Sequence, residues 1–159
     1  MRNLIAGTIV VASLAWGNSI AADQPGYGQW TAAAIKAREA ELTKHVAADH
    51  SSRETLGEYG DHRFRLLYRD ADGLPEQHDH IIDVVIVQSG EGTLQLGGPM
   101  IGKREGGSAG EYLGTRLDGG ERHPLVPGDI VHIPATIPHS FLVPAGGHIT
   151  YVLVKFPAR

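Results

Sequence analysis

The sequence predicts an all-β domain, built as an antiparallel sandwich or barrel, with one α-helix before it. Two observations predict the β part: short β-branched runs recur after Gly60, and Gly, Pro and Asp separate them. The third observation predicts the helix: a segment near the N-terminal end is rich in alanine and contains neither Gly nor Pro.

Residues 1–22 have the order of a secretory signal peptide. Arg2 is their only charge, an apolar run covers 4–16, and small residues follow it, so that cleavage after Ala21 or after Ala22 fits. The run is shorter than the roughly 20 residues of a membrane-spanning helix, although an uncleaved anchor is the alternative. We therefore expect a periplasmic or secreted protein without stable membrane anchoring.

The next segment is predicted to be helical from Gln29 to about His50. Ile35, Leu42 and Val46 have helix-compatible spacing, and the remaining residues are mostly alanine and charged. This pattern is typical of one amphipathic helix, or two short ones, packed over the outside of a domain. Residues 23–60 are accordingly interpreted as an N-terminal helical extension.

Residues 61–159 are predicted to form the β domain. The runs at 84–90 and 92–98, joined through Glu91 between glycines, are typical of a β-hairpin. The Gly-rich residues 98–121 predict a long mobile insertion, either an ordinary surface excursion or a lid. Six strands are predicted: 62–69, 81–90, 92–98, 129–135, 139–144 and 148–156.

Composition narrows the classes of function. The formal net charge is −4 and no Lys/Arg cluster is present, which disfavours a nucleic-acid partner. The chain has no cysteine, so thiol catalysis and thiolate metal sites are excluded. Its nine histidines suffice for a site that would hold Fe, Mn, Ni, Cu or Zn through imidazole and carboxylate ligands.

The candidate chemistry centres on His78 and His80. Residues two apart on a strand point to the same face, so both imidazoles could reach one ion. A third donor comes from the segment 128–139, where a glycine turn leads into an apolar strand and a proline-bounded bend delivers His139 onto the next strand.

These residues resemble the two motifs of the cupin superfamily. The second motif fits from Gly128 through Pro134 to His139, and departs at Thr136, where the family usually has glycine, and at Val143, where it usually has asparagine. The resemblance covers roughly residues 62–156. It implies a double-stranded β-helix, that is, a jelly-roll barrel, and allows a homodimer.

The first motif fits at His78, His80 and Gly90, with Asp83 in place of the family's glutamate and one residue too close to His80. In the family, the two histidines, the carboxylate and the later histidine bind a divalent metal, which implies His78, His80, Asp83 and His139 as ligands here. Strand alternation places Asp83 opposite His80 unless a bulge intervenes. Three histidines with water, substrate or Gln88 are therefore the alternative ligand set.

Two classes of function follow. The first is a metal-dependent enzyme, a dioxygenase, isomerase or lyase acting on a small polar molecule, in which Tyr68, Gln77 and Gln88 line the mouth and the general acid or base is unidentified. The second is a non-catalytic module that binds a small ligand, with a structural metal or none. The shifted acid, together with Thr136 and Val143 at the motif's Gly and Asn positions, favours the second class.

Overall fold

The computed structural model describes residues 24–159. The predicted signal peptide at residues 1–22 therefore lies outside the described residues. Within the described part, no helix has the length and apolar character that crossing a membrane requires.

The helix α1 spans Ala32–Leu42. Thr31 caps it, because its Oγ1 accepts a hydrogen bond from the Ala34 N–H at 3.2 Å. The predicted helix over 29–50 was too long, since the chain turns after Leu42 and enters a strand at Ser51. Residues 43–50 form turns instead, and His50 has a φ of 57°, a left-handed backbone that an α-helix does not contain.

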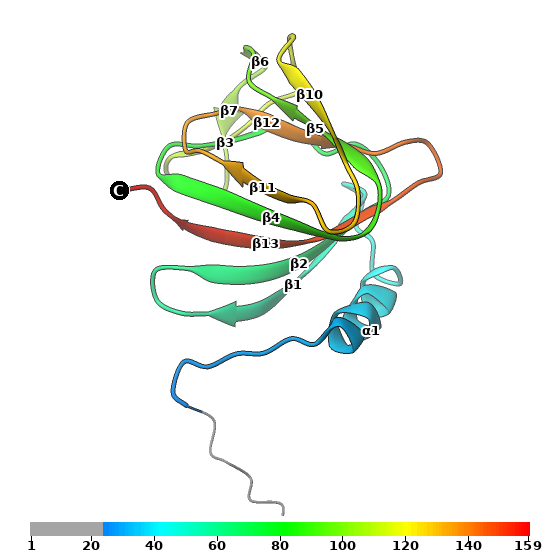
Figure 1. Ribbon diagram of the computed structural model, residues 1–159. Coiled ribbons are helices and arrows are strands. Elements are labelled where there is room, and N and C mark those ends of the chain that lie inside the picture. Colours follow the sequence, from blue (N-terminus) through cyan, green and yellow to red (C-terminus); the bar gives the residue numbers. More distant parts are fainter. Residues whose placement is uncertain (1–23) are drawn as a thin grey trace, which may run out of the picture.

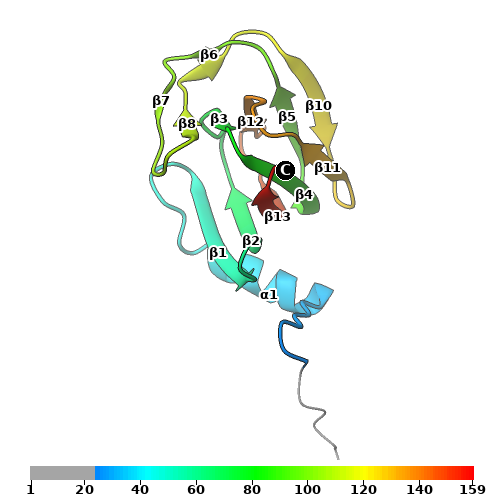
Figure 2. The same cartoon turned by 90° about the vertical axis from the view of Figure 1, so that its left-hand side faces the viewer.

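Two sheets form the body of the molecule, with α1 beside the β1–β2 end of one of them (Figure 1). The first sheet has the order β1 (Ser51–Glu58), β2 (Arg63–Arg69), β13 (Ile149–Pro157), β4 (Ile81–Gly90) and β11 (Ile130–Ile133). The second has the order β10 (Glu121–Leu125), β5 (Gly92–Leu96), β12 (His139–Leu142), β3 (Glu76–His78), β8 (Glu111–Leu113) and β7 (Arg104–Glu105). Every strand pair is antiparallel, and the two sheets close into a jelly-roll barrel (Figure 2).

The all-β prediction is confirmed, and each of the six predicted runs contains a strand. The predicted hairpin over 84–98 was wrong. β4 pairs with β11 and β13, whereas β5 pairs with β10 and β12, so the chain changes sheets at Gly90. Gly90 has a φ of 68°, and a Cβ there would collide with the carbonyl oxygen of His148. The corner therefore requires glycine for two separate reasons.

The Gly-rich insertion also differs from its prediction. It forms the short strands β6 (Met100–Ile101), β7, β8 and β9 (Arg116–Leu117) instead of a structureless loop. β7 and β8 extend the second sheet beyond β3. At the other end, β1 belongs to the first sheet, so the predicted helical extension over 23–60 contains a strand of the barrel. The predicted boundary at residue 61 itself remains a prediction.

Alternation along β4 and β13 determines what fills the barrel. Val85 and Val87 on β4, with Tyr151 and Leu153 on β13, belong to the main buried cluster. The intervening Val152 packs on the opposite side with Ile35, Leu42 and Leu66, under α1. Continuing the period of two along each strand brings polar residues, Asp83 and Lys155, to the inward face at the same end of the barrel.

Candidate metal centre

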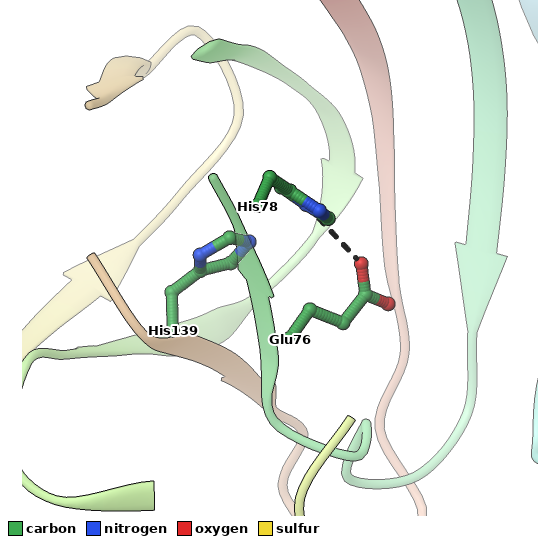
Figure 3. Close-up of side chains that lie close together, drawn as sticks. All are labelled: Glu76, His78 and His139. Atoms are coloured by element: carbon green, nitrogen blue, oxygen red, sulfur yellow. Dashed lines mark ion pairs between the residues drawn. The ribbon is translucent and has the colours of Figure 1, made fainter. Parts of the chain in front are cut away.

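Three side chains inside the barrel present metal-binding atoms to one another. One ligand atom from each of Glu76, His78 and His139 lies within 4.8 Å of the other two. His78 and His139 are buried, Glu76 is half-buried, and the Glu76 carboxylate lies 3.6 Å from His78 Nε2 (Figure 3). Imidazole and carboxylate donors in this number suit a divalent transition metal. The described residues could therefore hold a metal ion here.

Sheet register brings these donors together. His139 on β12 is the direct cross-strand partner of Glu76 on β3. Two residues further along β3, His78 is the direct partner of Glu111 on β8. Because side chains two apart share a face, Glu76 and His78 point to the same side of the sheet. Two adjacent cross-strand pairs thus line the second sheet's side of the site.

His139 is oriented by the bend that precedes it. Its Nδ1 lies 3.0 Å from the carbonyl oxygen of Ile137, and because a carbonyl can only accept, Nδ1 carries the proton. The lone pair is then on Nε2, which faces the carboxylate of Asp83 at 3.6 Å. This is the tautomer that a metal-binding histidine needs.

Asp83 reaches the cluster from the opposite sheet. Its side chain is buried, and Oδ2 lies 3.3 Å from His78 Nε2. Burial alone would raise the pKa of the carboxyl. The neighbouring His139 and His78 side chains and the Lys155 ammonium outweigh burial and hold the pKa of Asp83 far below its ordinary value. Asp83 is therefore a carboxylate in the folded protein.

His80 is not part of this group. β3 ends at His78 and the chain bends at residues 79–80, so the strand alternation that predicted a shared face does not apply. The His80 side chain is exposed, whereas His78 is only 4% exposed. Among the predicted ligands, the structure thus brings together His78, Asp83 and His139 and leaves His80 outside, with Glu76 in the donor group.

A lysine contacts two of these side chains, His78 and Asp83. Lys155 on β13 is the cross-strand partner of Asp83, and its side chain is buried. Its Nζ lies 2.8 Å from both carboxylate oxygens of Asp83 and 2.8 Å from His78 Nε2. An ammonium group can only donate, so this contact requires the lone pair of His78 to be on Nε2.

The other nitrogen of His78 faces Glu111. Glu111 Oε2 lies 2.5 Å from His78 Nδ1, yet this buried nitrogen forms no hydrogen bond of acceptable geometry. Burial and the Lys155 ammonium both lower the pKa of His78. The contact with Asp83 and the charges of Asp83 and Glu111 outweigh them and raise the pKa of His78 above its ordinary value. The environment of His78 is therefore strongly anionic.

Further polar groups continue the interior beyond the cluster. Arg69 is buried, lies 3.9 Å from Glu76, and leaves its Nε without a hydrogen bond. Burial raises the pKa of the neighbouring Tyr151 phenol to about 12, against the opposing effect of Arg69. Phe141 stacks on Tyr151, with ring centroids 4.7 Å apart. Phe141 and Tyr151 belong to the buried core, and the Phe141 ring lies next to the ring of His139.

A pocket of about 380 Å³ opens onto the cluster. Lys155 and Glu111 are the members of the cluster that line it. The remaining lining residues come mostly from the β1–β2 turn: Glu58, Gly60, Asp61, His62, Arg63 and Ile81. A small polar molecule can therefore reach Lys155 and Glu111 from solvent. The residues predicted at the mouth of the barrel do not line this pocket; they are Tyr68, Gln77 and Gln88. Tyr68 packs instead against the hydrophobic residues under α1.

Comparison with solved structures identifies the architecture. A cupin-2 domain protein from Rhodospirillum rubrum superposes with a TM-score of 0.50 and 18% identity, over 69% of this chain and 62% of that one. The fold is a cupin barrel. KdgF from a Halomonas species matches with a TM-score of 0.51 and 19% identity, over 69% of this chain and 81% of that one. Pac13, a nucleoside dehydratase from Streptomyces whose structure was solved with uridine, matches with a TM-score of 0.50 and 13% identity, over 71% of this chain and 74% of that one. No protein-family model and no curated protein matches the sequence.

The two departures from the second motif, Thr136 and Val143, lie at hydrogen-bonded backbone positions. Thr136, at the usual glycine position, has a φ of 70°, a left-handed backbone that favours glycine. Its N–H donates to the carbonyl oxygen of His78 at 2.7 Å and so ties the bend to β3. Val143, at the usual asparagine position, is buried, and its N–H donates to Asp72 at 2.7 Å. At both positions the backbone N–H is hydrogen-bonded without the side chain that the motif usually has.

Sequence reasoning missed three members of the site: Glu76, Glu111 and Lys155. Glu76 carried a usable signal, since it lies two residues before His78 and hence on the same strand face. Lys155 also carried one, as the only charge in the apolar run 149–156. Glu111 carried none, because its place depends on the pairing of β8 with β3 inside an apparently structureless segment.

Proposed function

We propose that this protein is an exported, metal-dependent enzyme that acts on a small polar molecule inside the cupin barrel. The observation that carries the proposal is the donor group of Glu76, His78 and His139, whose ligand atoms lie within 4.8 Å of one another. The pocket beside it supports a small substrate. Dioxygenase, isomerase and lyase chemistry all fall within this proposal.

Glu76, His78 and His139 would hold the ion, and Asp83 would join them where Lys155 releases it. A divalent ion bound there would supply a Lewis acid for a substrate oxygen or for an activated small molecule. Fe, Mn, Ni, Cu and Zn all suit this donor set. The barrel limits access of bulk water, which strengthens every electrostatic interaction of a substrate with the site.

The residues at the base of the pocket would orient the substrate. Lys155 presents a donor and Glu111 an acceptor, so a molecule with both hydroxyl and carbonyl groups can be held by complementary hydrogen bonds. Export is supported by the leader pattern of residues 1–22. The proposed location is the periplasm or the exterior of the cell.

Metal content tests this proposal. The mature protein would be purified without chelator or affinity metal, reconstituted with each candidate ion, and measured by elemental mass spectrometry. We expect close to one equivalent of a transition metal, lost in a His78→Ala/His139→Ala variant. A His123→Ala/His132→Ala variant, which removes two exposed histidines, is the matched control and should retain the metal. An empty wild-type protein after reconstitution would contradict the proposal.

One observation favours a second function, a non-catalytic module that binds a small ligand without a metal. The Lys155 ammonium already pairs with Asp83 and contacts His78, so a protein group alone compensates the buried carboxylate without a metal ion. This alternative predicts that small polar ligands raise the melting temperature of chelator-treated protein as much as that of metal-treated protein. A metal-dependent enzyme would show the larger shift with metal.

A further inference from the structure

The position of Lys155 is fixed by the sheet and does not depend on a flexible surface segment. Its neighbours along the inward face of β13 are Leu153 and Tyr151, both members of the buried core. Across the strand pair it faces Asp83 in register. With 8% of its surface exposed, Lys155 is a buried cation at the end of an apolar strand. Such a residue persists only where a counter-charge compensates it.

The contacts of Lys155 are those that a metal ion would make. It uses the lone pair of His78 Nε2 and both oxygens of Asp83, each at 2.8 Å. His78 is one of the three residues whose donor atoms form the candidate metal group. A lone pair that accepts a hydrogen bond from an ammonium cannot at the same time coordinate a metal. Two cations within one cluster would also repel each other strongly, because the site is poorly screened by solvent.

We propose that Lys155 is a built-in competitor for the metal, so that the cluster holds either the lysine ammonium or the metal ion, but not both. The inference rests on the proposed function, since it concerns the same site. It adds that metal binding displaces Lys155 from His78 and Asp83. The affinity of the protein for metal is then the intrinsic affinity of the donors reduced by the stability of the lysine contacts.

The pocket gives the displaced side chain a destination. Lys155 lines the pocket wall, together with the carboxylates of Glu111, Glu58 and Asp61. A lysine side chain has four rotatable carbons, so its ammonium can leave the cluster while its backbone stays in β13. In the pocket it would meet acidic groups and solvent. Displacement therefore exchanges one set of anionic partners for another and leaves no buried charge without a counter-charge.

The first test is the metal affinity of a Lys155→Met variant, measured by chelator competition with Zn²⁺ and Co²⁺. Methionine keeps the length of the side chain and removes its charge. We expect binding to be tighter than in the wild type by roughly 5- to 150-fold, the range of ordinary coupling between two sites. Lys36→Met, which removes an exposed lysine of α1, should leave the affinity unchanged. Equal or weaker binding by a folded Lys155→Met variant would overturn the inference.

The second test uses the wild-type chain and so does not depend on whether the variant folds. The sequence has four lysines, and of these Lys155 is the one that is buried. Acetic anhydride labelling, read by peptide mass spectrometry, should modify Lys155 slowly without metal and several-fold faster with Zn²⁺ bound. Lys36, Lys44 and Lys103 serve as internal controls with unchanged rates. An unchanged rate at Lys155 in metal-loaded protein would refute displacement.

The two proposals can fail separately. If the wild type binds metal and Lys155→Met binds it no more tightly, the metal site is supported and the competition by Lys155 is refuted. If the wild type binds no metal and Lys155→Met does, the metal-dependent function is refuted. The competition is then supported, because the lysine excludes the metal completely. If neither binds and both are folded, both proposals are wrong.

Discussion

Lys155 and Asp83 face each other across adjacent antiparallel strands, with the ammonium nitrogen 2.8 Å from each carboxylate oxygen. Their side chains are only 9% and 3% exposed, so water screens this ion pair little. The cost of burying each charge is offset mainly by the other, and by the neighbouring histidines. The two residues therefore depend on each other for stability.

A first prediction concerns the metal-free protein. Lys155→Met leaves Asp83 as an unpaired buried charge, and Asp83→Asn leaves Lys155 unpaired, so each should lower the free energy of unfolding by about 3 to 5 kcal/mol. The double variant removes both charges and should lose much less than the sum of the single losses. Urea denaturation of the four chelator-treated proteins measures this cycle. Additive losses would show that the pair is not energetically coupled.

A second prediction concerns alkaline pH. The pKa of Tyr151 is raised to about 12, above the ordinary value of 10.0, so the neutral phenol is favoured in the folded state. Its stabilising contribution is complete below pH 10 and is lost as pH rises towards 12. At about 1.4 kcal/mol per pKa unit, the loss amounts to roughly 3 kcal/mol.

Absorbance at 295 nm would follow tyrosine ionisation in this experiment. Of the five tyrosines, we expect one to ionise only near pH 12 or on unfolding, and Tyr151→Phe should remove that late step. Tyr27→Phe is the matched control, because Tyr27 is 58% exposed. A late step that persists in Tyr151→Phe would assign the shifted phenol to another residue.

The sequence was most informative where inward-facing and outward-facing side chains alternate along a strand. The run 81–90 predicted a strand, and in the strand found there Asp83 shares its inward face with Val85 and Val87. The alternation argument from His80, which placed Asp83 on the opposite face, does not apply because the chain bends at residues 79–80. The motif around Pro134 and His139 predicted the histidine that lies in the donor group. These features depend on local pattern, and hydrophobic burial enforces that pattern along each strand.

Features that depend on pairing between distant segments were not predictable. His80 was predicted on the face of His78, but β3 ends at His78, two residues too early for alternation to reach His80. Glu111 enters the site only because β8 pairs with β3. The change of sheet at Gly90 depends on a close approach to His148, some sixty residues away. Non-local contacts of this kind leave little trace in a single sequence.

A third prediction concerns Glu111, which lies 2.5 Å from the Nδ1 of His78. A carboxylate that accepts a hydrogen bond from the second nitrogen of a metal-binding histidine orients the ring and raises its basicity, and Glu111 is close enough to His78 Nδ1 to take this role when the metal is bound. Glu111→Gln should therefore weaken Zn²⁺ binding by about 10- to 100-fold. Glu105→Gln, an exposed change in the neighbouring strand β7, should leave binding unchanged. An unaltered Zn²⁺ affinity in Glu111→Gln would mean that Glu111 lines the pocket but does not orient His78 for metal binding.

A fourth prediction concerns the bend before His139. Thr136 is exposed and has a φ of 70°, and a left-handed backbone costs an L-residue about 1 to 2 kcal/mol. Glycine removes that strain, although its freedom in the unfolded chain costs about 0.5 to 1 kcal/mol. Thr136→Gly should therefore raise the free energy of unfolding by roughly 0.5 to 1 kcal/mol, as measured by urea denaturation.

Thr136→Ala separates this backbone effect from the loss of the side chain. Alanine retains a Cβ and hence the strain, so it should gain little or nothing. Both variants keep the N–H that donates to His78 at 2.7 Å, and for that reason Zn²⁺ affinity should not change in either. A loss of stability in Thr136→Gly would mean that the threonine side chain stabilises the bend by more than the strain it imposes. The position would then be occupied by threonine for a packing reason that glycine cannot supply.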